Sequence, residues 1–309
     1  MKHIYFIFNP QAGKAEMTAY LGFTIDKMTK AGYEVTVHPT QGKLDAMHMA
    51  AKAADSGRFD YIFCAGGDGT LNEVMTGLTH SVVRIPLGYI PCGSTNDFAR
   101  SIGIPFSIPE ALDAVLNGRP RYFDVGTANG RTFNYIVAFG AFTDVPYDTP
   151  QAVKNVFGQA AYMFNAVTKL PNIRAIPSRI TCDGQVFEGE YIYGMVTNSA
   201  SVGGVLDIRD FQFDDGMFEL TLIKRPQNPV EFGNTVRFLR DIHEIGEEDP
   251  VVCLKGSEIT IELLEENNVP WTVDGEYMEN TAKLRIINHK RALPLLVPRE
   301  CSSEIFLLE

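Results

Sequence analysis

The first 125 residues alternate between strand-like and helix-like segments, and this alternation restricts the fold more than any other feature of the sequence. Short apolar runs rich in Ile, Phe, Tyr and Val are separated by longer segments with apolar side chains at helical spacing. The expected elements are strands at 3–8, 33–38, 59–65 and 85–90 and helices at 15–31, 44–55, 71–78 and 97–102. Repeated βα units of this length predict a mostly parallel sheet covered by helices.

The pattern changes after about residue 125. Asn129-Gly130 and Asp183-Gly184 each lie between β-rich runs, and such pairs favour tight hairpins of antiparallel strands. Further strands are expected at 191–197, 217–223, 258–263, 270–273 and 282–287, with helices near 151–170 and 230–245. We therefore predict an α/β domain at 1–125 with a parallel sheet, followed by a mainly antiparallel β domain at 126–292.

Charge and cysteine content exclude several classes of protein. The net charge of −11, from 27 basic and 38 acidic residues, argues against general nucleic-acid binding, which needs a basic face. The five cysteines form no C-x-x-C pair, which is typical of reduced thiols in a cytoplasmic protein. No signal peptide is visible, and no run approaches the roughly 20 apolar residues of a spanning helix.

The segment from Cys64 to Glu73 reads C-A-G-G-D-G-T-L-N-E, between an expected strand and an expected helix. Glycines let the backbone approach a phosphate closely, and the N-terminus of the helix offers unpaired N–H donors. An acid in such a loop would repel phosphate unless a divalent cation lay between them, so Asp68 implies Mg²⁺. A structural interpretation is also open, in which the glycines form a tight turn and Thr70 with Glu73 forms a capping box.

Three motifs of the first domain, in this order, resemble the diacylglycerol kinase catalytic-domain family, which includes soluble bacterial lipid kinases and sphingosine kinases and is related to NAD kinases. They are Phe8–Lys14 (F-N-P-Q-A-G-K), Gly66–Glu73 (G-G-D-G-T-L-N-E) and Leu87–Arg100 (L-G-Y-I-P-C-G-S-T-N-D-F-A-R). Weaker matches at Asp214–Gly216 and Val273–Glu276 extend the resemblance into the second domain. No G-x-G-x-x-G or G-x-x-x-x-G-K-[ST] motif is present.

The resemblance implies a nucleotide site in the first domain, with ATP and Mg²⁺ as cofactors. The positions that it places at the nucleotide are Asn9, Thr40, Gly66, Gly67, Asp68, Gly69, Thr70, Leu71, Asn72 and Ser94. Ser94 stands where the family pattern has threonine, and serine keeps the hydroxyl donor. Ser94 also fits a helix N-cap paired with Asp97, a role compatible with nucleotide contact.

The resemblance also implies two catalytic acids. Glu276, in the Asp274-Gly275-Glu276 turn, matches the family's base, which accepts the proton of the lipid hydroxyl. Asp68 belongs with Mg²⁺·ATP and the transferring phosphoryl group. Which of the two takes the proton stays open, and a solvated Glu after an ordinary hairpin turn is the alternative for Glu276.

The resemblance implies roles for three further acids and for two backbone carbonyls. Asp97 and Asp124 match acids that connect the two domains, with a helix-terminal charge and a turn as alternatives. Asp215 matches the ligand of a second metal ion, together with the backbone carbonyls of Gln212 and Met217, and a plain Asp-Gly hairpin is the alternative. The resemblance also suggests that 293–309 returns to the first domain, where Leu295-Leu296-Val297 could form a buried strand.

One stretch suits contact with a membrane surface. Residues 149–182 contain no Asp or Glu but carry Lys154, Lys169, Arg174 and Arg179 beside aromatic side chains. Apolar and basic groups together suit anionic headgroups, although aromatics at helical spacing are more often core. Lys14 could steady a phosphate, with an exposed helix-opening lysine as the commoner case.

The function expected from the sequence is phosphoryl transfer from Mg²⁺·ATP to a lipid hydroxyl, with diacylglycerol the favoured substrate. The protein would be cytoplasmic and would meet its lipid transiently at the inner face of the membrane; formation of a homo-oligomer is left open. The alternatives are a kinase of a soluble substrate resembling NAD kinase, and a nucleotide-binding regulator without turnover.

Overall fold

The computed structural model describes residues 1–140, 174–199, 201–202, 206–207, 211–239, 249–265, 269–299 and 305–307. The chain forms two compact units. The first contains Met1–Val125, Phe213–Asp215 and Lys290–Glu309, and the second contains Gly126–Gln212 and Gly216–His289. The α/β fold expected from the sequence is confirmed, with parallel strands in the first unit and antiparallel strands in the second.

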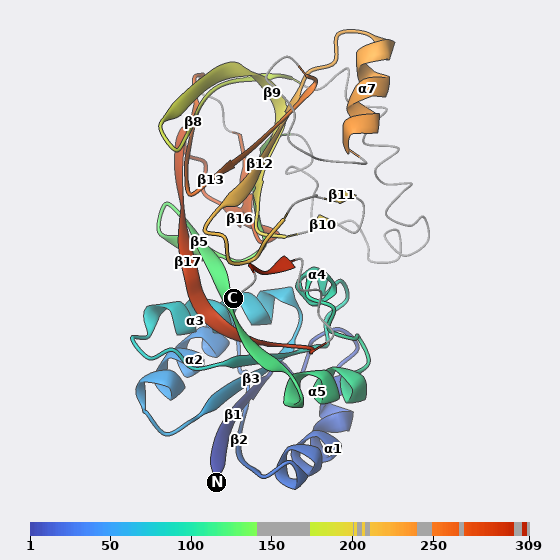
Figure 1. Ribbon diagram of the computed structural model, residues 1–309, viewed down its shortest axis with the longest axis vertical. Helices are drawn as coiled ribbons and strands as arrows, with labels where there is room; N and C mark the ends of the chain where they lie inside the picture. Colours follow the sequence, from blue (N-terminus) through green and yellow to red (C-terminus); the bar gives the residue numbers. More distant parts are fainter. Residues whose placement is uncertain are drawn as a thin grey trace. The chain divides into compact units, whose positions relative to one another are not determined.

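The first unit is a parallel sheet with helices packed in pairs. Its elements are β1 Lys2–Phe8, α1 Glu16–Lys30, β2 Tyr33–Pro39, α2 Asp45–Asp55, β3 Tyr61–Gly66, α3 Asp68–His80, β4 Leu87–Pro91, α4 Asp97–Ser101 and α5 Ile108–Leu116. The strand order β4-β3-β1-β2 is parallel throughout, and β17 joins it beside β4 at the pair Leu295–Leu87. Helix α1 packs with α5 and α2 with α3, on opposite sides of the strands (Figure 1).

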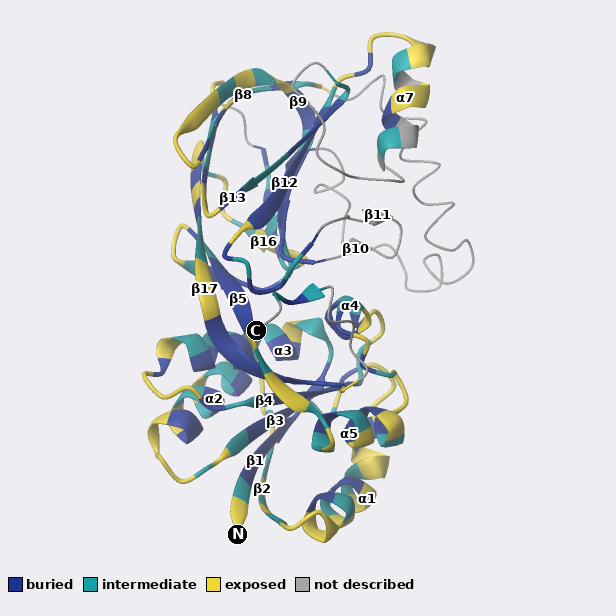
Figure 2. Cartoon of the chain, in the orientation of Figure 1, coloured by how far each residue is buried: buried dark blue, intermediate teal, exposed yellow. Residues whose placement is uncertain are grey.

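Burial explains why these segments form strands. Residues 4–8 of β1 and 62–66 of β3 are all buried, as expected for central parallel strands covered on both faces (Figure 2). Edge strand β2 instead alternates between half-buried and exposed positions over most of its length. The apolar runs of the sequence therefore mark the middle of the sheet.

The second unit is an antiparallel β structure. Its elements, with β5 and β17 crossing between the units, are β5 Arg119–Ala128, β6 Arg131–Phe133, β7 Ile136–Gly140, β8 Ile176–Cys182, β9 Gln185–Thr197, β10 Ser201–Val202, β11 Leu206–Asp207, β12 Phe218–Lys224, α7 Pro229–Leu239, β13 Val251–Gly256, β14 Glu258–Leu263, β15 Trp271–Val273, β16 Glu276–Met278 and β17 Lys283–Val297. The strand order is β16-β15-β7-β9-β8-β14-β17, and β12 pairs with β9 and β13. Fully buried Trp271, Phe133, Phe139 and Phe218 lie in its core.

Both hairpins expected from Asn-Gly and Asp-Gly pairs are present. Asn129-Gly130 has φ values of 46° and 85°, and Asp183-Gly184 has 45° and 84°. Positive φ at both central residues is the conformation that joins twisted antiparallel strands with the fewest residues. The turn at Asp274-Gly275, with φ values of 49° and 80°, has the same form.

Several elements differ from the sequence expectation. Helix α5 and strand β13 were not predicted, and the expected strands at 282–287 and 295–297 are parts of one strand, β17. Residues 213–215 belong to the first unit, which the sequence had not suggested. The helix expected near 151–170 lies outside the described residues, and the one expected at 230–245 is described only as far as Leu239.

Helices α2 and α3 approach so closely that a glycine is required between them. A Cβ on Gly77 would lie 2.2 Å from the carbonyl oxygen of Met47 and 3.2 Å from the Cβ of Ala50. Gly22 in α1 is the opposite case, because a Cβ there would meet no atom within 4 Å.

We therefore expect Gly77→Ala to lower the free energy of unfolding by about 1–3 kcal/mol, because the two helices must separate. Gly22→Ala should raise it by about 0.5–1 kcal/mol, since alanine costs less conformational entropy in an exposed helix. Urea denaturation of both variants measures these changes. Equal effects of the two substitutions would contradict the close packing of α2 on α3.

Candidate functional site

Loops at the carboxyl ends of the parallel strands form the candidate nucleotide site. Backbone hydrogen bonds join each loop to the neighbouring strand end. The N–H of Asn9 donates to Ala65 O at 2.9 Å, and that of Thr40 donates to Phe8 O at 2.9 Å. The N–H of Cys92 donates to Gly66 O at 2.8 Å. Because the strands are parallel, the loops that follow them lie at one edge of the sheet. The motifs that are separate in the sequence are thus brought together in the first unit.

Glycines allow these loops to touch. A Cβ on Gly93 would lie 2.5 Å from the Cα of Gly67, and a Cβ on Gly66 would lie 2.6 Å from the Cβ of Thr70. Gly13, with φ of 55°, comes so close to the loop after β4 that its Cβ would be 2.3 Å from the carbonyl oxygen of Cys92. At Gly69 a Cβ would meet nothing within 4 Å. The glycine run is therefore packed at Gly66 and Gly67 and open at Gly69, in the first turn of α3.

Asp68 is the first residue of α3, and its carboxylate joins two loops. Its two oxygens accept the backbone N–H groups of Asp97 and Phe98, each at 3.3 Å. Burial raises the pKa of the Asp68 carboxyl above its ordinary value, and these N–H donors oppose the shift. Asp68 therefore stabilises the N-terminus of α4, a role that the sequence did not reveal.

The alternative interpretation of the glycine segment included a capping box formed by Thr70 and Glu73, and this part of it is wrong. Helix α3 begins three residues earlier than expected, so Thr70 lies inside its first turn, where its hydroxyl accepts the Asn9 side-chain amide at 3.2 Å. The Glu73 carboxylate instead accepts the backbone N–H of Leu44 at 2.8 Å, at the start of α2. Glu73 thereby joins α3 to the loop that contains Thr40.

Ser94 does not cap α4, contrary to one of its two expected roles. It is exposed, and the N-cap position is Asn96, whose φ of 54° is left-handed. The Asn96 side chain bonds both polar groups of Gly93, accepting from its N–H and donating to its carbonyl oxygen at 2.9 Å each. The helix begins two residues later than a Ser94 cap would require, and Asp68 provides the acceptor.

The other predicted nucleotide contacts have distinct environments. Leu71 is 2% exposed, so any contact it makes with a nucleotide would involve its backbone. Asn72 accepts the Thr76 hydroxyl at 3.3 Å, and the Asn9 side-chain oxygen accepts the Gln11 N–H at 2.9 Å. Asn72 is thus bonded within α3, while Asn9 is bonded both to its own loop and to Thr70 of α3. Their role toward a nucleotide stays a prediction.

In the second unit, Glu276 follows a tightly held turn. It is exposed on β16, and its carboxylate lies 3.4 Å from the Arg131 guanidinium, which also donates to Tyr277 O at 3.0 Å. The preceding Asp274 accepts the backbone N–H groups of Asn134, Tyr135 and Ile136 at 2.9–3.0 Å. Burial raises the pKa of Asp274 to about 6, against the effect of these donors. Asp274, which the sequence indicated only as a turn residue, holds the loop before β7.

Asp124 and Asp214 join the separate segments of the first unit. Fully buried Asp124 accepts the Arg291 N–H at 2.7 Å, and its own N–H donates to Phe213 O at 2.8 Å. Asp214 accepts the Arg291 guanidinium at 3.0 Å and the Leu307 N–H at 2.7 Å. The role expected for Asp97 and Asp124 between the domains stays a prediction.

The second metal site, at Gln212, Asp215 and Met217, also stays a prediction. Met217 is 41% exposed and lies just before β12. Within the described residues, no three or more His, Cys, Asp or Glu side chains gather as metal ligands would. A site of one carboxylate and backbone carbonyls, as expected here, would not form such a cluster.

The basic stretch is described only at its end. Lys154 and Lys169 lie outside the described residues. Arg174 pairs with Glu265 at 2.6 Å, and Arg179 with Glu188 at 2.7 Å. Lys14 is exposed, in line with its commoner interpretation.

Comparison with known proteins agrees with this arrangement. Residues 3–128 match the model of the diacylglycerol kinase catalytic domain, and residues 137–296 match that of the YegS C-terminal NAD kinase beta sandwich-like domain. A diacylglycerol kinase of Bacillus subtilis is 36% identical over 307 residues, covering 99% of both chains. One of Staphylococcus aureus is 33% identical over 299 residues, covering 96% of this chain and 93% of that one.

The chain belongs to the diacylglycerol kinase family. It is therefore a lipid kinase that uses a nucleotide of the ATP type. A diacylglycerol kinase structure from Bacillus anthracis has the same fold, with a TM-score of 0.76 at 24% identity over 97% of this chain and 98% of that one. Among the described residues of this lipid kinase, no helix is long and apolar enough to cross a membrane.

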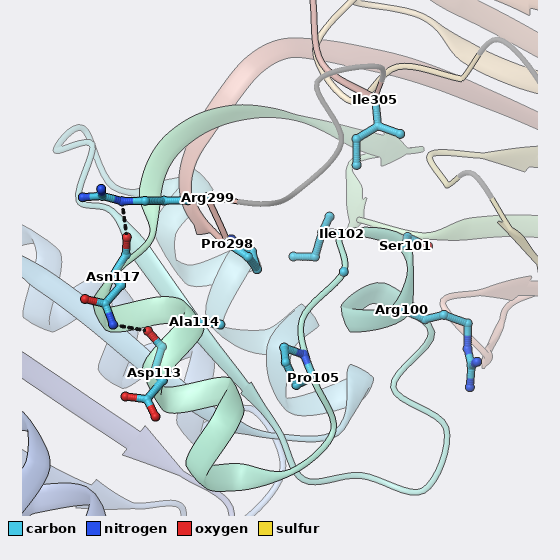
Figure 3. Close-up of a pocket in the computed structure, with 11 residues that line it drawn as sticks. Arg100, Ser101, Ile102, Pro105, Asp113, Ala114, Asn117, Pro298, Arg299 and Ile305 are labelled. Carbon is cyan, nitrogen blue, oxygen red and sulfur yellow. Dashed lines mark hydrogen bonds between the residues drawn. The ribbon is translucent and has the colours of Figure 1, made fainter.

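The lipid kinase also has a hollow of about 660 Å³ in its first unit, beside α5 (Figure 3). Ile102, Ala114 and Pro298 contribute apolar surface to it, and the Arg299 Nε donates to Asn117 O at 2.9 Å at its side. No side chain predicted to bind the nucleotide or catalyse the reaction is among its lining residues.

The bond from Glu73 to Leu44 can be tested with a conservative pair of variants. Glu73→Ala should lower the free energy of unfolding by about 1 kcal/mol, as expected for loss of a helix cap. Glu73→Gln should lose less than half as much, because its amide oxygen can still accept the Leu44 N–H. Urea denaturation gives both values, and equal losses would show that this hydrogen bond does not stabilise α2.

Proposed function

We propose that this lipid kinase transfers the γ-phosphate of Mg²⁺·ATP to the free hydroxyl of diacylglycerol, giving phosphatidic acid. The support is twofold: relatives that match over nearly the whole chain bear the name diacylglycerol kinase, and the first unit has a glycine loop suited to phosphates beside a half-buried carboxylate. The lipid would be met at the membrane surface from the aqueous side.

The first unit has the features needed to hold the nucleotide. The first turn of α3 has backbone N–H groups that lack intrahelical partners, and the open position at Gly69 leaves room for phosphate oxygens. Asn9, Thr40 and Ser94 would contribute from neighbouring loops. The open space at Gly69 and the N-terminus of α3 are the two observations that support nucleotide binding at this site.

Asp68 fits a magnesium ligand. A carboxylate that accepts two N–H groups still has acceptor capacity, and oxygen is the ligand that Mg²⁺ prefers. Desolvation raises the pKa of the half-buried Asp68 carboxyl, and a nearby positive charge would compensate for that desolvation. A bound divalent cation would supply that compensation and neutralise charge on the phosphates.

We assign the proton acceptor to Glu276. The Asp68 carboxylate already accepts two backbone N–H groups. Glu276, in contrast, is exposed on a hairpin that Asp274 and Arg131 hold in place. The lipid hydroxyl oxygen forms a bond to the γ-phosphorus as the bond from that phosphorus to the β–γ bridging oxygen breaks. Glu276 takes the hydroxyl proton, and ADP leaves with the bridging oxygen.

Steady-state assays of ADP release test these assignments, with diacylglycerol in mixed micelles and Mg²⁺·ATP. Glu276→Gln should lower kcat roughly 100-fold or more, the usual contribution of a general base, with little change in the KM for ATP. Asp68→Asn should lower kcat/KM for Mg²⁺·ATP to a similar extent. Glu279→Gln, an exposed acid of the same region, is the matched control and should retain wild-type activity.

The substrate class is tested by the same assay with a sphingoid base, a monoacylglycerol and NAD in place of diacylglycerol. The proposal predicts phosphatidic acid as the main product. Phosphorylation of NAD without any lipid product would contradict it, as would nucleotide binding without turnover on any of these acceptors.

A further inference from the structure

Tyr89 is a fully buried tyrosine directly behind the glycine loop. It lies in the middle of β4, and its hydroxyl donates to the carbonyl oxygen of Gly66 at 3.2 Å. The same hydroxyl lies 3.5 Å from the Oδ1 of Asn96, at the limit of a hydrogen bond. Burial, followed by the charge of Asp68, raises the pKa of Tyr89 well above its ordinary value, so its hydroxyl stays a donor.

Asn96 connects Tyr89 to Gly93, the residue that lies against Gly67 of the glycine loop. Its side chain forms a closed pair of hydrogen bonds with Gly93, whose Cα faces the Cα of Gly67 too closely for any side chain. The left-handed conformation of Asn96 also places the next two backbone N–H groups on the Asp68 carboxylate. Asn96 is 5% exposed, so it acts through these neighbours and is shielded from solvent.

We propose that Tyr89 and Asn96 are positioning residues that fix the glycine loop and the Asp68 carboxylate for phosphoryl transfer. This inference rests on the proposed function of the site. Because Tyr89 is fully buried and Asn96 is only 5% exposed, both would act through the loop and not by contact with the nucleotide. The pair sets where the loop amides and the Asp68 oxygens lie, and the site then needs less reorganisation when the phosphates bind.

The bonds of Tyr89 can be removed with little change in packing. The Tyr89 ring contacts Phe98 edge to face, with 6.3 Å between centroids, and phenylalanine would keep this contact. Gly66 O would also keep the Cys92 N–H. Tyr89→Phe therefore tests the hydroxyl alone, and Tyr5→Phe, at a 6% exposed tyrosine of β1, is the matched control.

We expect Tyr89→Phe to lower kcat/KM for Mg²⁺·ATP roughly five-fold, the effect of one hydrogen bond, while the KM for the lipid stays unchanged. Asn96→Gly, which tolerates the left-handed backbone, should lower it roughly 10- to 100-fold, because two bonds are lost. Asn96→Ala should show the same kinetic loss with a lower midpoint of thermal unfolding, since alanine is strained in that conformation.

A two-fold or smaller change in kcat/KM for ATP in both Tyr89→Phe and Asn96→Gly would overturn the proposal. An equal loss in Tyr5→Phe, or an equal change in the KM for lipid, would also overturn it, because the effect would then be general destabilisation. If the wild-type enzyme phosphorylates no lipid, the proposed function fails instead. In that case, binding of Mg²⁺·ATP by calorimetry still distinguishes Tyr89→Phe from wild type if the positioning role holds.

Discussion

The close approach of Gly67 and Gly93 is the contact on which the first unit's site depends. It brings the loop after β3 against the loop after β4, at a separation that leaves no room for a side chain at position 93. Once the loops touch, the Asp68 carboxylate can accept N–H groups from the start of α4. A half-buried acid, a helix terminus and the open Gly69 position are thereby combined in a few residues, which is the arrangement that the proposed binding of phosphate and magnesium needs.

The same loops are connected to the segments where the chain passes between the two units. The Phe98 ring packs on Phe123 and Phe213, with centroids 5.1 and 6.2 Å apart, and Phe213 packs on Phe306 at 5.6 Å. Beside these rings, the bonds of Asp124 and Asp214 to Arg291 join 119–125, 213–215 and the C-terminal segment. One aromatic and polar cluster of the first unit thus supports both α4 and the ends of the crossing segments.

The sequence was informative wherever a local pattern decides the structure. Fully buried parallel strands produce uninterrupted apolar runs, and Asn-Gly or Asp-Gly turns require positive φ, so β1, β3 and two hairpins could be predicted. Long-range partners could not be read from local patterns. Glu73 fits a capping box in the sequence, yet its partner is Leu44, 29 residues away. Asp274 is indistinguishable from an ordinary turn residue until the loop 134–136 is placed beside it.

Binding of a non-hydrolysable ATP analogue with Mg²⁺ to the Gly93→Ala variant, measured by calorimetry, tests the central contact most directly. The added Cβ would lie 2.5 Å from the Gly67 Cα, so the glycine loop must move while the helices and sheet stay folded by circular dichroism. We predict a Kd at least roughly tenfold higher than that of wild type, with Gly22→Ala unchanged. A folded Gly93→Ala protein that binds the analogue as tightly as wild type would contradict the account.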